Sequence, residues 1–325
     1  MKSYWIVKTA HGTALDAREV PVPHPAAGQV VVRMHASSIN RGDILASISR
    51  HSAAAGRPAG VDGAGTIYAI GEGVHKLAVG DRVMVRAKGA FAEYAATDAA
   101  LVTPMPAGMS FEHAAAIPVA YITAYEAVMQ LGHLQAGEWL LVAGASSGVG
   151  IAALQAAKLL SARVIGISGS AEKLDRLKAM GLDVGIKARG AGFAAAAREA
   201  TAGKGVNLAV NLVGGTAFPD CVEALADFGR LAVVGYVDGL MKAELDLESV
   251  HGKRLQIFGV SNAPLATPRR ATAQRGFERE LLPALAEGRI APVIDRVFGF
   301  DEAADAKTYV ERNALLGKVV IKIVP

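Results

Sequence analysis

An apolar segment that runs straight into a turn of small residues constrains this chain more than any other feature. Leu140–Ala143 is typical of a buried strand, and a helical pattern begins a few residues later. The turn between them reads Gly144-Ala145-Ser146-Ser147-Gly148-Val149-Gly150. The whole stretch Trp139–Ala157 is uncharged and long enough to span a membrane. Because glycines and serines interrupt it, we expect a strand, a tight turn and a helix instead.

The start of this helix has the properties of an anion site. Backbone N–H groups in the first turn of a helix lack an intrahelical partner, and the helix dipole is positive there. Small side chains also let a phosphate approach the backbone. The glycine positions of the fingerprint G-x-G-x-x-G hold Ala145, Ser147 and Gly150, so the match is incomplete. We expect residues 144–150 to bind a pyrophosphate; a sharp turn without a ligand is the alternative.

Residues 119–262 alternate between strand-like and helix-like patterns. The strand candidates are Trp139–Ala143, Arg163–Ser168, Val184–Lys187, Asn207–Leu212, Arg230–Gly235 and Leu255–Gly259. The helix candidates are Gly148–Ser161, Ala171–Met180, Phe193–Ala202 and Ala217–Ala226. Ser170 is a suitable N-cap for the second of these helices. Strands joined by helical crossovers predict a parallel, doubly wound sheet.

Residues 1–118 show short strands and Gly/Pro turns instead, which predict a compact, barrel-like β unit. Its strand candidates are Tyr4–Lys8, Val30–Ala36, Gly65–Ile70, Arg82–Arg86 and Phe91–Ala95. The last part of the chain predicts a helix over 271–287, a strand near 293–300, a helix near 301–312 and a strand over 318–324. This part is too short for a domain of its own. We therefore expect an α/β protein with a β-rich domain over 1–118 and 263–325 and a doubly wound domain over 119–262.

Composition excludes several classes of protein. With 52% hydrophobic and 20% charged residues, the chain is not intrinsically disordered. The net charge of +4 and the pI near 9.1 are compatible with a polyanion partner, but the charges are dispersed, which argues against nucleic acid. Cys221 is the single cysteine, so an intramolecular disulfide and a cysteine-based zinc site are both impossible. The N-terminus lacks a signal-peptide layout, and we expect a cytoplasmic protein without a membrane segment.

The end of the second Rossmann strand indicates which dinucleotide is bound. NAD enzymes usually place Asp or Glu there, on the ribose hydroxyls. Here the acid is missing, and Ser168, Ser170 and Lys173 offer hydroxyls and a positive charge. These groups suit a 2′-phosphate, so we expect NADPH. Alternatively, Ser170 only caps a helix and Lys173 is solvated; both roles are compatible.

The order and spacing of many short motifs resemble the zinc-independent quinone oxidoreductase, or ζ-crystallin-like, branch of the medium-chain dehydrogenase/reductase superfamily. The matching pieces are Val20–Pro23, Ser38–Asp43, Gly60–Gly71, Val79–Val83, Ala115–Ala124, the turn 145–150, Asn211–Gly215, Gly229–Gly235 and Gly317–Val320. The resemblance implies a GroES-like catalytic domain formed by both chain ends, NADPH in the cleft beside a Rossmann domain, and a homodimer built through the Rossmann sheets. It also implies cofactor contacts from Gly235, Tyr236, Val260, Ser261 and Asn262.

The chain departs from this family at a residue beside the adenosine phosphate. The tyrosine that often flanks the phosphate in the family is Ala188 here, between Lys187 and Arg189. These two cations are candidates to replace it. The sequence leaves open which of the two contacts the 2′-phosphate.

The chain also departs from the zinc-containing relatives at the positions of the metal. Their Gly-His-Glu triplet is Gly60-Val61-Asp62 here, and their zinc-ligating cysteine is replaced within Ser38–Asn40. The lobe with structural cysteines is absent, since Asp81-Arg82-Val83 runs almost directly to Phe91. The resemblance to the metal-free branch therefore implies that no zinc takes part.

Without metal, the expected reaction is direct hydride transfer from the nicotinamide to a quinone or a conjugated carbonyl. Negative charge develops on the acceptor oxygen, and hydrogen-bond donors stabilise it. The resemblance places Asn40, Tyr121 and Thr123 at the nicotinamide; Asn40 as a turn residue is the alternative. Two other functions stay open: reduction of an enoyl thioester or other activated alkene, and a non-catalytic, crystallin-like or RNA-binding protein that holds NADPH.

Substrate specificity is expected in two segments, Leu45–Ala55 and Ala263–Arg270. Quinone reductases of this type carry a tyrosine where Leu45 stands, and the Arg-Ser-Gly stretch after it is Ser47-Ile48-Ser49 here. Both segments are rich in small or flexible residues, as binding loops often are. We therefore expect a more open and less polar pocket than in those enzymes.

Overall fold

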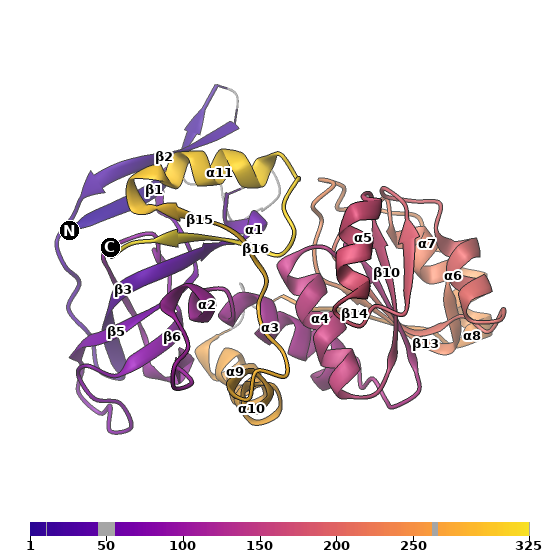
Figure 1. Cartoon of the computed structure of the whole chain (residues 1–325), viewed down its shortest axis with the longest axis horizontal. Coiled ribbons are helices and arrows are strands. Elements are labelled where there is room, and N and C mark those ends of the chain that lie inside the picture. The colour runs from indigo at the N-terminus through magenta and orange to yellow at the C-terminus, as the bar shows by residue number, and fades with distance from the viewer. Residues whose placement is uncertain (11, 45–55, 262–265, 325) are drawn as a thin grey trace. The chain divides into compact units, whose positions relative to one another are not determined.

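The chain forms two compact units, which we describe separately. The computed structural model describes residues 1–10, 12–44, 56–261 and 266–324. One unit combines Met1–Ile122 with Leu265–Pro325, and the other is Thr123–Pro264. The first unit therefore contains both ends of the chain, and the indigo and yellow segments of Figure 1 lie together in it.

A single parallel sheet organises the unit Thr123–Pro264. Its strand order is β11-β10-β9-β12-β13-β14. The strands are β9 (Trp139–Ala143), β10 (Arg163–Ser168), β11 (Val184–Lys187), β12 (Val206–Asn211), β13 (Leu225–Val233) and β14 (Gln256–Gly259). All neighbouring strands in this sheet are parallel. The chain runs outward from β9 in one direction and then returns to start the other half at β12. This is the strand order of the dinucleotide-binding Rossmann fold.

Helices cover both faces of this sheet. They are α4 (Gly148–Leu159), α5 (Ala171–Lys178), α6 (Ala194–Ala200), α7 (Phe218–Glu223) and α8 (Leu247–Lys253), preceded by the π-helix η2 (Glu126–Gln130). On one face, alternate residues of the central strands pack against α6 and α7 in a cluster that includes Leu141, Ile165, Phe193, Ala209 and Cys221. Helices α4 and α5 lie on the opposite face (Figure 1). The strands are therefore buried on both sides, which explains their continuous apolar runs.

Antiparallel strands dominate the other unit. One sheet has the order β15-β16-β3-β5-β6-β8, with β7 also paired to β3, and a smaller sheet has the order β2-β1-β4. The strands are β1 (Lys2–Thr9), β2 (Gly12–Glu19), β3 (Gln29–Ile39), β4 (Arg57–Pro58), β5 (Asp62–Ile70), β6 (Arg82–Arg86), β7 (Tyr94–Asp98), β8 (Val102–Pro104), β15 (Ile294–Gly299) and β16 (Lys318–Lys322). Because β16 pairs with β3, the C-terminal strand completes the sheet that the N-terminal segment begins.

Short helices close this unit. They are α1 (Arg41–Ile44), η1 (Ala99–Leu101), α2 (Phe111–Ala115), α3 (Pro118–Tyr125, which continues into the second unit), α9 (Thr267–Glu280), α10 (Leu282–Ala286), η3 (Phe300–Glu302) and α11 (Ala303–Glu311). Helix α11 packs beside β16 through Ala303, Ala306 and Val310. The hydrophobic core between them also contains Met34 and Phe91, both fully buried.

Most predicted elements are confirmed, and the exceptions have physical causes. Four strands, at 82–86, 139–143, 163–168 and 184–187, have the predicted bounds. The predicted helix over 217–226 is wrong at its end, because Leu225 leaves the helix to pair with Val206. The predicted helix over 271–287 divides into α9 and α10, since Pro283 cannot donate a backbone hydrogen bond. Strand β2 was not predicted; none of its residues is buried, which explains the weak signal.

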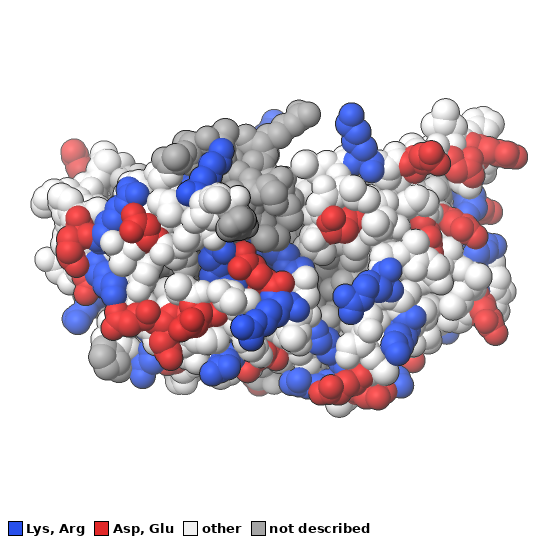
Figure 2. All heavy atoms as spheres, turned by 90° about the horizontal axis from the view of Figure 1, so that it is seen from above, with Lys and Arg blue, Asp and Glu red and all other residues white. Residues whose placement is uncertain are grey.

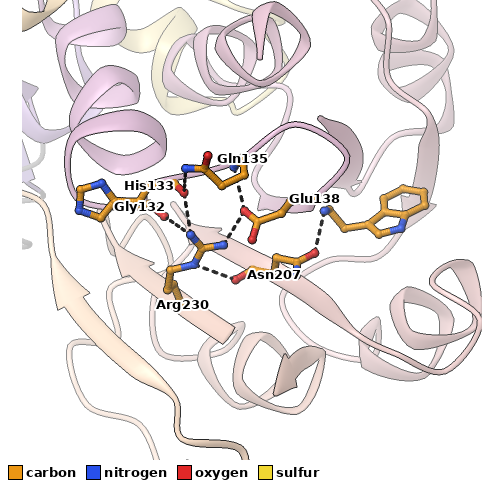
Figure 3. Close-up of polar contacts among 7 residues, drawn as sticks. Gly132, His133, Gln135, Glu138, Asn207 and Arg230 are labelled. Carbon is orange, nitrogen blue, oxygen red and sulfur yellow. Dashed lines mark hydrogen bonds and ion pairs between the residues drawn. The ribbon is translucent and has the colours of Figure 1, made fainter. Parts of the chain in front are cut away.

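One ion pair ties together the loops at the starting edge of the Rossmann sheet. The guanidinium of Arg230 donates to the carbonyl oxygens of Gly132 and His133 at 2.7 and 2.8 Å and to Glu138 at 2.6 Å (Figure 3). It also donates to the backbone oxygen of Asn207 at 3.3 Å. The side chain of Arg230 is only 13% exposed. This one cation therefore holds the β9 entry loop against β12 and β13.

Two observations concern the length of the helices and the distribution of charge on the surface. No helix in the described ranges has both the length and the apolar character needed to cross a bilayer. On the face that Figure 2 shows, basic and acidic side chains are interspersed. This agrees with the dispersed charge of the sequence.

Replacing Arg230 with methionine should lower the stability of the Rossmann unit. The change leaves the carboxylate of Glu138 and the carbonyl oxygens without their charged donor, which typically costs about 2–4 kcal/mol. Urea titration of the wild-type protein and of Arg230→Met would measure the loss in the free energy of unfolding. The matched control is Arg176→Met, which changes an exposed arginine on α5. An equal, small effect of both substitutions would contradict this role of Arg230.

Candidate functional site

The predicted cofactor residues of the Rossmann unit gather at one edge of its sheet. The turn 144–150 follows β9, Ser168 ends β10, and Gly235 and Tyr236 follow β13. Val260 and Ser261 follow β14. Because all strands are parallel, these segments lie at the same carboxyl edge, where doubly wound folds bind their ligands. Asn262 lies outside the described residues.

The turn after β9 is held by the Ser147 side chain. Its hydroxyl donates to the carbonyl oxygen of Gly144 at 2.9 Å and accepts the N–H of Gly150 at 3.1 Å. Ser147 is thus the N-cap of α4, a role that its position in the glycine fingerprint did not indicate. Within the described part of the chain, the N–H groups of Gly148 and Val149 have no acceptor. They are the two donors that this helix offers to an anion.

Two glycines of this turn are required by geometry. Gly144 has a φ of +90°, a conformation that L side chains rarely adopt. A Cβ on Gly150 would lie 2.6 Å from the carbonyl oxygen of Gly144 and 2.7 Å from that of Ala145. Gly150 therefore lets α4 pack directly on the end of β9. Ala145, 1% exposed, is buried beneath the turn, so it contributes packing.

The second strand ends in hydroxyl groups and has cations beside it. The hydroxyl of Ser168 donates to that of Ser146 at 3.5 Å and accepts the N–H of Ser170 at 3.4 Å. Ser170 caps α5, as predicted, by accepting the N–H of Lys173 at 3.3 Å. The cap uses only the oxygen of the Ser170 hydroxyl as an acceptor, so its O–H can still donate, and Ser168, Ser170 and the half-buried Lys173 all stay candidates next to this edge.

Of the two cations that flank Ala188, Arg189 lies over Gly169, the residue between Ser168 and Ser170. A Cβ built on Gly169 would lie 3.2 Å from Nε and 3.4 Å from Nη2 of Arg189. Both cations are exposed, and Lys187 is at the end of β11. The sequence left the choice between them open, because the contact depends on how the loop after β11 folds back over β10.

The predicted residue Asn40 belongs to a polar cluster in the other unit, centred on Asp62. Asp62 is fully buried at the start of β5. Its Oδ1 accepts the hydroxyl of Ser38 and the Nδ2–H of Asn40, both at 2.9 Å, and its Oδ2 accepts the N–H of Val119 at 3.2 Å. The ammonium of Lys318, on β16, donates to Oδ1 of Asn40 at 2.6 Å.

Burial and hydrogen bonding have opposite effects on the pKa of the Asp62 carboxyl. On balance the pKa of the Asp62 carboxyl is raised: burial, the largest effect, raises it, and the positive charge of Lys318 and the hydrogen bonds from Ser38, Val119 and Asn40 lower it only in part. Every contact to the two oxygens comes from a donor, which is the pattern of an ionised carboxylate. Asp62 and Lys318 are residues that sequence analysis did not assign to the site. The available signal was an acid at the end of Gly60-Val61-Asp62, in an otherwise apolar strand.

Tyr121 and Thr123 lie on α3, whose first turn is anchored by the bond from Val119 to Asp62. Tyr121 is 1% exposed, and burial raises the pKa of its phenol above the usual range. Its hydroxyl is therefore neutral at physiological pH and suited to hydrogen bonding rather than to proton abstraction. Thr123 is half-buried.

The described residues do not suit a zinc ion. The positions that the sequence comparison linked to zinc hold Val61 and Ser38–Asn40, and both oxygens of Asp62 already accept hydrogen bonds from donors. No group of three or more His, Cys, Asp or Glu side chains in the described ranges is arranged to hold a metal. Of the expected substrate segments, Leu45–Ala55 and residues 263–265 lie outside the described residues.

Comparisons with known proteins match both units. Residues 26–107 match the alcohol dehydrogenase GroES-like domain family, and residues 148–272 match the zinc-binding dehydrogenase family. The chain is 31% identical over 95% of its length to a phenolphthiocerol/phthiocerol polyketide synthase protein of Mycobacterium tuberculosis, of which it spans only 14%. It is 30% identical over 94% of its length to the synaptic vesicle membrane protein VAT-1 homolog of Rattus norvegicus, of which it covers 80%.

Solved structures share the fold over nearly the whole chain. A mycobacterial protein complexed with NADPH has a TM-score of 0.87 and 25% identity, covering 99% of this chain and all of that one. A mycobacterial quinone oxidoreductase gives 0.83 and 25%, with 99% and 100% covered. The CurK enoyl reductase gives 0.84 and 25%, with both chains fully covered.

These matches and the two units define the class of the protein. The chain belongs to the medium-chain dehydrogenase/reductase superfamily, and it combines a GroES-like domain with a Rossmann domain.

Adding a methyl group at Gly150 should impair dinucleotide binding. In Gly150→Ala the new Cβ meets two backbone oxygens, so α4 must move away from the turn that carries the free N–H groups. We expect the Kd for NADPH, measured by fluorescence titration, to rise by about 10-fold or more. Gly252→Ala on α8 is the control, because nothing lies within 4 Å of its Cβ. Unchanged affinity in Gly150→Ala would show that the turn is not the binding site.

Proposed function

We propose that this protein is a zinc-independent, NADPH-dependent reductase of quinones or enones. The observation that carries the proposal is the carboxyl edge of the Rossmann sheet. Two free N–H groups start α4 after β9, and Ser168 ends β10. Ser170 and Lys173 lie at the start of α5, and Arg189 follows β11 and packs over Gly169. These groups match a pyrophosphate and a 2′-phosphate. The NADPH complex and the quinone oxidoreductase among the similar structures support it.

In this proposal the residues of the chain bind and orient the dinucleotide and stabilise the negative charge that develops on the substrate. Gly148 and Val149 hold the pyrophosphate with their N–H groups, and Ser168, Lys173 and Arg189 hold the 2′-phosphate. The bound dinucleotide supplies a hydride, and solvent supplies the proton that completes the reduction. Asn40 and the neutral hydroxyl of Tyr121 serve as hydrogen-bond donors to the acceptor oxygen as it becomes negative.

The cations beside Ser168 should determine the choice between NADPH and NADH. Losing one charged contact to a phosphate typically costs about 1.5–3 kcal/mol, or roughly 10- to 100-fold in Kd. We expect Lys173→Ala and Arg189→Ala to weaken NADPH binding by this factor and to leave NADH binding nearly unchanged. Lys187→Ala, at the exposed end of β11, is the matched control. If both dinucleotides weakened equally, neither cation would be reading the 2′-phosphate.

Turnover with a panel of acceptors tests the reaction itself. We expect steady NADPH oxidation with small quinones and short enones, and activity that survives a metal chelator, since the described residues do not suit zinc. Metal-dependent activity would contradict the proposal. Binding of NADPH without oxidation by any acceptor would favour the non-catalytic alternative.

A second candidate is reduction of an enoyl thioester. The match to a polyketide synthase and the structural similarity to an enoyl reductase favour it. It uses the same cofactor edge, and it differs only in the acceptor. An acyl-thioester substrate in the same panel distinguishes the two: a kcat/KM for the thioester well above that for quinones would select the second candidate.

We also propose that the protein forms a homodimer through its Rossmann sheets. Strand β14 is the edge strand of the sheet, and Ile257 on it is 37% exposed. The nearby segment 236–247 adds the exposed side chains of Leu240, Met241 and Leu247. An apolar edge of this kind favours pairing with a second copy. A monomeric mass in sedimentation equilibrium would refute the dimer.

A further inference from the structure

The Asp62 cluster contains an amide that is held between two opposite charges. Oδ1 of Asn40 accepts from the ammonium of Lys318 at 2.6 Å, and Nδ2 of the same amide donates to Asp62 at 2.9 Å. Lys318 is 5% exposed and Asp62 is fully buried. All members belong to one unit of the chain, in which β3, β5 and β16 are hydrogen-bonded neighbours.

The chemistry of the two partners fixes the orientation of this amide. A lysine ammonium can only donate hydrogen bonds, and an ionised carboxylate can only accept them. If the amide turned over, Nδ2 would face the ammonium and Oδ1 would face the carboxylate, and both contacts would be repulsive. Asn40 therefore has a single favourable orientation.

One hydrogen-bond donor remains on Asn40 in that orientation. An asparagine amide has two N–H bonds, and one of them is committed to Asp62. For the second, the described residues supply no acceptor. The amide is half-buried, so this N–H stays available to a ligand. A fixed donor of this kind stabilises developing negative charge at no cost in reorganisation.

We propose that Asp62 and Lys318 are positioning residues, which hold the Asn40 amide so that its remaining N–H donates to the acceptor oxygen as that oxygen becomes negative. This inference rests on the proposed function, because it assigns a purpose to Asn40 in that reaction. It also explains why the fold buries two charges that are joined through an amide. Such burial is costly for stability, and it is retained where it imposes one defined geometry.

A double-mutant cycle between Lys318 and Asn40 tests the proposal. Losing one preorganised donor lowers kcat by roughly 100-fold or more in well-studied oxyanion sites, and we expect about 10- to 100-fold for Asn40→Ala. Lys318→Met should lower kcat by a similar factor and leave the Kd for NADPH within about twofold, because the phosphate site is elsewhere. In the Asn40→Ala background, Lys318→Met should have almost no further effect on kcat.

The matched control is Lys322→Met, which changes an exposed lysine on the same strand and should leave kcat unchanged. Additive effects of Lys318→Met and Asn40→Ala would overturn the positioning role, as would full activity of either single variant. If Lys318→Met does not fold, Lys318→Arg keeps the charge but changes the contact. The kcat of Lys318→Arg should be lower than that of the wild type, and in the Asn40→Ala background Lys318→Arg should cause no further decrease. A further decrease in that background would overturn the positioning role of Lys318.

A measurement without turnover separates this inference from the proposed function. The side-chain amide signals of Asn40 can be assigned in an NMR spectrum by their loss in Asn40→Ala. We expect them to shift strongly in Lys318→Met and to stay in place in Lys322→Met. If the wild-type protein oxidises NADPH with none of the acceptors in the panel, the proposed function fails. If the Asn40 amide signals do not shift in Lys318→Met, the amide is not held by Lys318 and the positioning role fails.

Discussion

A carboxylate without access to water determines how the first unit is assembled. Asp62 must find donors inside the protein, because an unpaired buried charge would cost several kcal/mol. The donors come from the end of β3, the first turn of α3 and, through Asn40, from β16. The end of β3, the start of α3 and β16 therefore meet at one buried side chain.

The Rossmann unit follows a different constraint, which is the close approach of α4 to β9. Gly150 has no room for a side chain. The hydroxyl of Ser147 holds the turn by donating to the carbonyl oxygen of Gly144 and accepting the N–H of Gly150. As a result, two backbone donors stay free at the carboxyl edge of the sheet. The proposed cofactor site is thus mostly backbone, and the side chains at the ends of β10 and β11 adjust which dinucleotide it prefers.

The two units divide the proposed chemistry between them. In our proposal the Rossmann unit supplies neutral backbone donors and a few cations for phosphate. The first unit supplies a donor whose direction is fixed in advance by buried charges. In our proposal an oriented amide takes the part that a metal ion plays in the zinc-containing relatives, which is to meet the negative charge on oxygen.

The sequence by itself determined most of the Rossmann strands, the capped helix at Ser170 and the tight turn between β9 and α4, because these depend on local patterns of apolar, small and hydroxyl residues. It did not determine where the helix beginning near Ala217 ends, since the pairing of Leu225 with Val206 overrides a local helical preference. It named Arg189 as one of two candidate cations but did not show that it packs over Gly169, and it did not reveal Lys318 beside Asn40. Only the tertiary structure decides such contacts, because a charged group selects its partner by proximity in space, and no local sequence pattern records that proximity.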